Sequence, residues 1–380
     1  MRKFAYKKLI VWLLLAMLLL SGCNPVMEVL PLPTQISEPE TEPPTQPPIE
    51  ETLSPTVPEG SEFQVWFIDV GQADAALVVC DGQTLLIDGG NVADSNLMYT
   101  FLKDKGVDHL DYVIGTHAHE DHIGGLSGAL NYAKPETVYC ATTSYTSNAF
   151  KNFASNVKKH NKTIKIPSVG TQFTLGSATC TVLAVNTAPD LNNTSIVVRI
   201  VYGSTSFLFT GDAEREVEDA MMDRGVPLQS TVLKVGHHGS YSSTGYAFLR
   251  NVMPQYAVIS CGKGNDYGHP HEEVLSRLKD AEVQLFRTDM QGTVMCTSDG
   301  KEVVFSVSNN EDANVFEKED FSAPTEPLFD GYVLNTRSMK FHHADCRNAA
   351  QIGEKNRREY SGSREDLIRQ GYEPCPNCNP

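Results

Sequence analysis

The chain has little positive charge to offer a nucleic acid. Its formal net charge at pH 7 is −16, and no lysine or arginine occurs between residues 24 and 62. No long basic patch occurs elsewhere, and tight, sequence-independent binding of DNA depends on many Lys and Arg contacts to phosphates. Such binding is therefore not supported. The acidity is concentrated in residues 24–62 and 309–330, so it does not exclude a phosphate-bearing ligand between them.

The N-terminus also lacks a hydrophobic run of membrane-spanning length. Four positive residues precede an apolar run over residues 9–20, and a bilayer span needs about 20 residues. The run ends in Leu-Ser-Gly-Cys, which resembles a bacterial lipobox ending at Cys23. We therefore expect residues 1–22 to be a cleaved signal peptide rather than a retained anchor. Cys23 would carry a lipid that tethers the chain to the outer face of the cytoplasmic membrane.

Low-complexity segments divide the rest of the chain. Residues 23–62 are rich in Pro, Thr and Glu and poor in large apolar residues. This composition predicts a disordered stalk, because so little apolar surface cannot offset the chain entropy lost on folding. An acidic linker over residues 309–330 separates residues 63–308, enough for one large domain, from a small module over residues 331–380.

The nine cysteines show no spacing typical of a disulfide framework. Cys23 belongs to the lipobox, and three more cluster near the C-terminus. The remaining five lie in apolar, strand-like contexts, which predicts buried free thiols. These five are Cys80, Cys140, Cys180, Cys261 and Cys296.

The most informative motif is Thr-His-Ala-His-Glu-Asp-His-Ile-Gly-Gly over residues 116–125, directly after an apolar, strand-like stretch. In a strand His117 and His119 point to the same side, and the following loop can turn Asp121 and His122 back toward the same point. Imidazole and carboxylate are ligands of hydrolytic Zn²⁺ sites, and Mn²⁺ or Fe²⁺ can use the same set. The motif therefore predicts a metal centre rather than a polar loop.

Other polar clusters follow other strand-like runs. Short β-rich runs alternate with helix-like stretches such as 213–225 and 272–280, which indicates sheets flanked by helices. Loops at strand ends carry functional residues on a rigid scaffold, and the polar clusters lie at such ends: residues 69–74, 88–90, 210–212, 235–240 and 261–270. Asp69 and Asp88 are as readily explained as caps of loops near the site.

The histidine motif is the metal-binding signature of the metallo-β-lactamase superfamily. The order of the motifs resembles the hydrolase domain of the competence protein ComEC, with Asp-Val-Gly-Gln-Ala-Asp, Gly-Asp, Lys-Val-Gly-His-His-Gly-Ser and Tyr-Gly-His-Pro. Ala73 replaces a glycine of that pattern. The resemblance covers roughly residues 63–308 and implies an α/β (α+β) fold, the αββα sandwich. It includes no multi-pass channel region, so it does not imply DNA import by this chain alone.

One departure from the superfamily pattern concerns a further histidine between the motif and Asp212. The matching stretch, residues 191–195, contains no histidine, as is usual in ComEC-like proteins. The resemblance implies that His117 and His119 hold one metal and that Asp121 and His122 help to hold another, with Asp212 bridging. One or two Zn²⁺ or Mn²⁺ ions would bind.

The last hydrolase ligand is left open among three histidines. Related nucleases place it on a late loop, which favours His269, whereas His237 and His238 follow an earlier strand and are alternative ligands or catalytic contacts. At least one of the three orients a ligand or contacts substrate. Asp121 can also orient the attacking water. The candidate contacts to a phosphoryl oxygen are Asn193, Lys234, Ser240 and Lys263, each of which is as readily explained as a structural residue.

The C-terminal module carries its own ligand pattern. His342 and Cys346, together with Cys375 and Cys378, provide four N and S ligands, the tetrahedral set of one structural Zn²⁺. His343 is an alternative to His342, and two disulfides or free thiols are the alternative to zinc. A module this small needs such a staple. It resembles the small metal-binding module related to the Ada DNA-repair protein.

Together these features predict a lipid-anchored, extracytoplasmic metallohydrolase acting on phosphodiesters, with nucleic acid or a nucleotide as substrate. A bound metal lowers the pKa of water from about 15.7 toward 7, which supplies hydroxide at neutral pH. One alternative is hydrolysis of a lactone, β-lactam or other carbonyl substrate. Another is a surface-displayed, zinc-dependent binding module with a vestigial hydrolase site.

Overall fold

The computed structural model describes residues 57–185, 190–317, 331–343, 346–350, 352–375, 378 and 380. The predicted signal peptide, Cys23 and most of the predicted stalk lie outside these residues, as does part of the predicted acidic linker. Within the described residues, no helix is both long enough and apolar enough to cross a membrane.

The first sheet has eight strands in the order β15-β14-β1-β2-β3-β4-β5-β6. Its N-terminal strands form antiparallel hairpins, with Val65 opposite both Val78 and Cys296, and β3, β4, β5 and β6 run parallel. The strands are β1 (Phe63–Phe67), β2 (Ala76–Cys80), β3 (Gln83–Ile87), β4 (His109–Gly115), β5 (Lys134–Cys140), β6 (Ile164–Lys165), β14 (Val294–Ser298) and β15 (Val303–Val307).

The second sheet has seven strands in the order β13-β12-β11-β10-β9-β8-β7. Its first four, from β13 to β10, are parallel, so the C-terminal ends of β10, β11 and β12 meet at one edge. The strands are β7 (Gln172–Leu175), β8 (Ala178–Ala184), β9 (Val197–Tyr202), β10 (Thr205–Phe209), β11 (Val232–Lys234), β12 (Tyr256–Ile259) and β13 (Gln284–Arg287).

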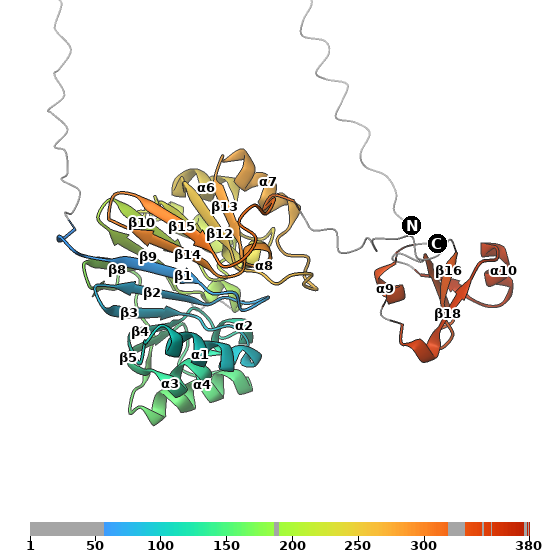
Figure 1. Ribbon diagram of the computed structural model, residues 1–380, viewed down its shortest axis with the longest axis horizontal. Helices are drawn as coiled ribbons and strands as arrows, with labels where there is room; N and C mark the ends of the chain where they lie inside the picture. The colour runs from blue at the N-terminus through green and yellow to red at the C-terminus, as the bar shows by residue number, and fades with distance from the viewer. Residues whose placement is uncertain are drawn as a thin grey trace, which may run out of the picture. The chain divides into compact units, whose positions relative to one another are not determined.

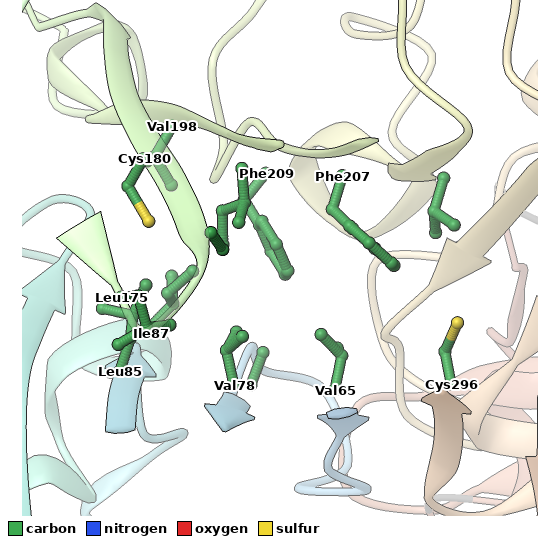
Figure 2. Packing of buried hydrophobic residues seen from close by; sticks show 14 of the residues in the cluster. Val65, Val78, Leu85, Ile87, Leu175, Cys180, Val198, Phe207, Phe209 and Cys296 are labelled. Carbon is green, nitrogen blue, oxygen red and sulfur yellow. The ribbon is translucent and has the colours of Figure 1, made fainter. Parts of the chain in front are cut away.

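The two sheets pack face to face around an apolar core. Val65 and Val78 of the first sheet face Phe207 and Phe209 of the second (Figure 2). All four side chains are at most 2% exposed. The core residues on each strand alternate with residues that face the helices, as a sheet covered on both sides requires.

Helices cover the outer face of each sheet (Figure 1). Helices α1, α3 and α4 pack on the first sheet, and α5, α6 and α7 pack on the second. The predicted αββα sandwich is therefore confirmed, and α7 has the bounds that the sequence predicted. The helices are α1 (Ser95–Asp104), α2 (Glu120–Ile123), α3 (Leu126–Tyr132), α4 (Asn148–Lys159), α5 (Arg215–Asp223), α6 (Tyr246–Val252), α7 (Glu272–Asp280) and α8 (Thr288–Gln291), with 3₁₀ turns η1 (Val92–Asp94), η2 (Asn192–Thr194) and η3 (Gly236–Gly239).

The C-terminal residues form a separate four-stranded sheet in the order β18-β16-β17-β19. Its small core contains Leu334, Phe341 and Leu367. Ser363 accepts a hydrogen bond from the backbone N–H of Asp366 and caps α10. The elements are β16 (Tyr332–Asn335), β17 (Lys340–His343), α9 (Arg347–Ala350), η4 (Glu354–Asn356), β18 (Arg357–Tyr360), α10 (Arg364–Arg369) and β19 (Glu373–Pro374).

Candidate metal centre

The histidine motif follows β4 and begins α2. His119 is the N-cap of α2, which places Asp121 and His122 in its first turn. His117 and His119 point to the same side, as predicted, with Nε2 of His117 2.9 Å from Nδ1 of His119. His117 and His122 are fully buried, whereas His119 and Asp121 are half-buried.

Glycines after the motif let the backbone of this segment pack closely on the loop after β3. A Cβ on Gly125 would lie 1.9 Å from the carbonyl oxygen of Gly89, so no larger residue fits without moving the backbone. The N–H of Gly89 donates to the carbonyl of His122 at 2.7 Å. This contact brings Asp88, at the end of β3, behind the motif.

Asp212 lies between two groups of histidines. Its Oδ1 is 3.2 Å from Nε2 of His122 and 3.6 Å from Nε2 of His238. Its Oδ2 is 3.8 Å from Nε2 of His117 and 3.7 Å from Nε2 of His237. The carboxylate therefore presents one oxygen to each side, which is the arrangement of a bridging ligand.

The donors form two groups that could each hold a metal ion. In one group, donor atoms of His117, His119 and Asp212 all lie within 4.8 Å of one another. In the other, donor atoms of Asp121, His122, Asp212 and His238 meet the same limit. Imidazole nitrogens and carboxylate oxygens in sets of three or four suit Zn²⁺ and related divalent ions.

Unsatisfied polar atoms indicate that the second group is built for a cation. Nε2 of His122, Nε2 of His238 and Oδ1 of Asp212 are buried and have no hydrogen-bond partner among the residues that the structure describes. A buried polar atom without a partner costs about 1–3 kcal/mol. These three atoms converge on one another, so a bound divalent ion would satisfy all of them together.

Carboxylates behind the histidines fix the ring orientations. Nδ1 of His122 is 2.9 Å from Oδ2 of Asp88, and Asp88 also accepts hydrogen bonds from the N–H and the hydroxyl of Thr116. Nδ1 of His238 is 3.1 Å from Oδ1 of Asp74 and 3.1 Å from the carbonyl of Ser260. Such contacts direct the other ring nitrogen, Nε2, toward a metal.

The buried charges favour a positive ion at the centre. Burial alone would lower the pKa of the His238 imidazole, but Asp212 and Asp74 outweigh it and raise that pKa to about 10. Burial would likewise raise the pKa of the Asp212 carboxyl, yet His122 and His238 hold it well below its usual range. Asp212 is therefore ionised and available as a ligand.

The backbone turn at η3 brings two consecutive histidines to Asp212. His237 and His238 both have positive φ angles, 48° and 52°. Nδ1 of His237 lies 3.2 Å from Oε1 of Glu214, and its Nε2 lies 3.4 Å from the amide nitrogen of Asn192. Asn192 belongs to the stretch without the superfamily histidine, so His237 occupies the region that this missing side chain would serve.

Of the three histidines that are candidates for the last hydrolase ligand, His269 lies furthest from the arrangement expected of a donor. It lies outside both donor groups, and its Nδ1 is 3.2 Å from the amide nitrogen of Gln72 instead. Burial and the neighbouring His238 and His237 lower its pKa to about 3, so its imidazole is neutral. His238, and not His269, belongs to the donor group with Asp121, His122 and Asp212.

Three of the four predicted phosphoryl contacts are buried structural residues. Nζ of Lys234 forms a 2.8 Å ion pair with Asp74, and Asn193 accepts a hydrogen bond from the N–H of Glu214. Ser240 contacts the hydroxyl of Ser242. Their burial, at most 5% exposure, removes them from direct contact with a ligand. Lys263 is exposed on the loop between β12 and α7.

A hollow of about 340 Å³ opens over the metal-binding residues. Four of its lining residues were assigned no role from the sequence: Gln72, Glu120, Asn192 and Tyr267. Glu120 lies within the histidine motif, and the other three reach the hollow through tertiary contacts. The remaining lining residues are His119, Asp121, Asp212, His237, His238 and His269.

The C-terminal sheet brings together a second kind of metal site. Donor atoms of His342, Cys346, Cys375 and Cys378 lie within 4.8 Å of one another. His342 is buried with Nδ1 3.6 Å from Sγ of Cys346, whereas the neighbouring His343 is exposed. All described cysteines are free thiols, so the alternative of two disulfides is not what the structure shows. The five cysteines of the sandwich are buried and unpaired, as predicted.

The comparisons with known proteins agree with this fold and site. The model of the metallo-beta-lactamase superfamily matches residues 68–263. The chain belongs to the metallo-β-lactamase superfamily, and it carries the donor set of a metal-dependent hydrolase.

Within that class the chain is similar to a ComE operon protein and to a competence protein. The chain is 32% identical over 268 residues to ComE operon protein 3 of Bacillus subtilis, a match that covers 65% of this chain and 34% of that protein. It is also 32% identical over 251 residues to competence protein ComA of Neisseria gonorrhoeae, covering 63% and 32%. The chain thus matches about a third of the length of these relatives, and the predicted resemblance to the ComEC hydrolase domain is confirmed.

Among solved structures, the metallo-beta-lactamase fold protein YhfI of Bacillus subtilis is similar with a TM-score of 0.42 and 14% identity. That match covers 64% of this chain and 100% of YhfI.

Proposed function

We propose that the chain is a metal-dependent phosphodiesterase that acts on nucleic acid or nucleotides. The observation that carries this proposal is the position of Asp212, which faces one donor group with each carboxylate oxygen. Two-metal sites of this kind suit in-line displacement at phosphorus, since they stabilise the attacking and the leaving oxygen together. Similarity to competence proteins, as their names describe them, supports a nucleic-acid substrate.

His117, His119 and Asp212 would hold one ion, with His237 as a further donor on the same side. Asp121, His122, His238 and Asp212 would hold the other. When bound, the ions supply Lewis acidity and lower the pKa of water.

The chain's own groups then position the reactants. Asp121, whose side chain is 31% exposed, can orient an attacking water from the hollow and accept its proton. Glu214 keeps the Nε2 atom of His237 directed at Asp212. Exposed Lys263 is the remaining candidate for a phosphoryl contact.

Ligand chemistry favours Zn²⁺ or Mn²⁺ in the hydrolase centre and one structural Zn²⁺ in the C-terminal sheet, because thiolates with an imidazole select zinc. The N-terminal charge pattern and the lipobox ending at Cys23 support attachment to the outer face of the cytoplasmic membrane through a lipid.

The test is hydrolysis by the metal-loaded, full-length protein of a single-stranded oligonucleotide, a lactone and a β-lactam. We expect Zn²⁺- or Mn²⁺-dependent cleavage of the phosphodiester, and loss of it in Asp212→Ala and His119→Ala with the fold retained. Hydrolysis of only the lactone or the β-lactam would show that the enzyme acts on a carbonyl substrate and not on a phosphodiester. A fully metallated protein that turns over none of the three would support a binding module.

A further inference from the structure

An exposed tyrosine stands at the rim of the metal-binding hollow. Tyr267 lines the hollow together with Asp121 and His238, yet 69% of its side chain is exposed. Large aromatic side chains gain their stability by burial, so the fold derives little from placing this ring in solvent beside the centre.

The loop that carries Tyr267 is held in one conformation by its own hydrogen bonds. Oδ1 of Asn265 accepts from the N–H groups of Tyr267 and His269, at 3.2 and 3.0 Å. The Asn265 amide donates to the carbonyl of Gly262 at 2.8 Å, and the N–H of Gly262 donates to the side chain of Gln72 at 3.0 Å. The ring of Tyr267 is thus positioned before any ligand arrives, which reduces the entropy lost on binding.

The ring of Tyr267 is also the outermost of three nearly parallel rings. It stacks on His269 with centroids 5.6 Å apart and an interplanar angle of 23°. His269 in turn lies 6.3 Å from the metal-site ligand candidate His238 at 26°. A planar group stacked on the free face of Tyr267 would therefore lie at the rim of the hollow, with His269 between the tyrosine ring and His238.

The described residues that line the hollow offer a phosphate backbone no basic side chain to contact. Its lining includes the carboxylates of Glu120, Asp121 and Asp212 and contains no lysine or arginine. A long phosphate backbone is bound mainly through Lys and Arg. Base stacking on an aromatic ring is worth about 1–3 kcal/mol per base and needs no basic residue.

Resting on the proposed phosphodiesterase activity, we propose that Tyr267 is a stacking platform for a nucleobase of the substrate strand at the rim of the metal-binding hollow. The site then takes an unpaired nucleotide, in a single strand or at a strand end. A base inside a duplex must first leave its stack, at a cost of a few kcal/mol.

The experiment compares a dT decamer with a decamer of abasic sugars joined by the same phosphodiesters. The variants are Tyr267→Ala, Tyr267→Phe and, as a matched control, Tyr246→Ala. Tyr246 is another exposed tyrosine, on α6, and it does not line the hollow. Metal content is measured for each variant to show that the centre is unchanged.

On the dT decamer, Tyr267→Ala should lose about 5- to 150-fold in kcat/KM, the range that 1–3 kcal/mol implies. Tyr267→Phe and Tyr246→Ala should stay close to the wild type. On the abasic decamer all four proteins should be equal, and the loss should persist at high salt because stacking is not ionic.

Three results separate the two proposals. A wild-type protein that cleaves both decamers, with Tyr267→Ala unchanged or equally impaired on both, overturns the platform and leaves the phosphodiesterase intact. Preference of the wild type for duplex over single-stranded DNA also overturns the platform alone. Failure of the metallated wild type to cleave either decamer overturns the phosphodiesterase, and the platform with it.

Discussion

His237 and His238 are neighbours in the chain, and their Nε2 atoms face different oxygens of one carboxylate. That of His237 lies 3.7 Å from Oδ2 of Asp212, and that of His238 lies 3.6 Å from Oδ1. Both residues have positive φ, a backbone region that costs non-glycine residues on the order of 1–3 kcal/mol. The turn thus delivers one imidazole to each side of the bridging carboxylate.

Replacing His238 tests this assignment directly. We expect His238→Ala to lose about one metal equivalent from the hydrolase centre, because it removes a donor from one group and leaves the other intact. Its loss of activity should exceed the 10- to 100-fold typical of residues that only orient a ligand. Metal analysis and kcat measure both effects. His269→Ala is the control and should keep its metal, and the reverse pattern would restore His269 as the ligand.

The buried ion pair behind His238 gives a second prediction. Lys234→Met leaves the carboxylate of Asp74 buried without its partner, which typically costs about 3–5 kcal/mol of stability. It should also weaken metal binding by roughly 10- to 100-fold, since Asp74 orients His238. Denaturant unfolding and a metal-competition titration measure the two quantities. Lys151→Met changes an exposed lysine on α4 and should alter neither stability nor metal affinity; an unchanged affinity in Lys234→Met would show that the ion pair does not support the ligand.

The buried carboxyl group of Glu218, on α5 and outside the metal donor groups, should make the free energy of unfolding depend on pH. Burial raises its pKa to about 7, although the N–H groups of Gly245 and Thr244 and the charge of Arg215 act in the opposite direction. The folded chain then keeps a proton that the unfolded chain releases near pH 4.5. The free energy of unfolding should therefore fall as the pH rises through this window, by roughly 3 kcal/mol, and stay low above it.

The variant Glu218→Gln removes that titration and should flatten the profile between the two pH limits. Because other groups titrate in both proteins, the informative quantity is the difference between the two profiles from denaturant unfolding. Parallel profiles would mean that Glu218 is ionised in the folded chain throughout.

The cysteines of the C-terminal sheet predict one zinc ion per chain that can be removed without affecting the hydrolase centre. Cys375→Ala should lower the zinc content by about one per chain and leave hydrolase activity in place, because the hydrolase donors belong to the sandwich. Cys180→Ala, in the apolar core between the sheets, should keep all of its zinc. Retention of all its zinc by Cys375→Ala would contradict a metal in this sheet, as would an intact wild-type mass that fits a disulfide between two of the three C-terminal cysteines.

The lipid anchor is tested at Cys23. We expect Cys23→Ala to block processing or to release the protein from the membrane fraction, because the lipid attaches to that thiol. Fractionation followed by intact mass measurement distinguishes the forms. A variant that stays membrane-bound with the mature mass of the wild type would rule out lipidation.

The spacing of the residues in the histidine motif was enough to predict four of the proposed metal-binding residues. His117, His119, Asp121 and His122 lie within six residues, in the loop after β4 and the first turn of α2, so local geometry brings them together. Asp212 could be predicted because it directly follows a strand. The layers of the fold could also be predicted. Alternating apolar runs and helix-like stretches indicate sheets flanked by helices, and the resemblance to the superfamily implies the αββα order.

The remaining ligand depended on backbone geometry that residue types do not encode. Two successive left-handed histidines are rare, and only their φ angles decide that His238, rather than His269, reaches Asp212. Of the two roles open to Lys234, the structure supports the structural one, for a related reason. A lysine beside a motif is usually exposed, and nothing near it in the sequence shows that Asp74, from a distant loop, neutralises it in the interior.

The donors come from both sheets, since the histidine motif follows β4 of the first and Asp212 follows β10 of the second. Neither half of the chain can coordinate a bridged pair of ions by itself. The bridged pair of ions can therefore bind only late in folding, after residues up to 238 have been synthesised and the two sheets have packed together. Metal occupancy therefore reports that the two sheets have packed together. An ion that binds only the complete sandwich also stabilises it, by mass action.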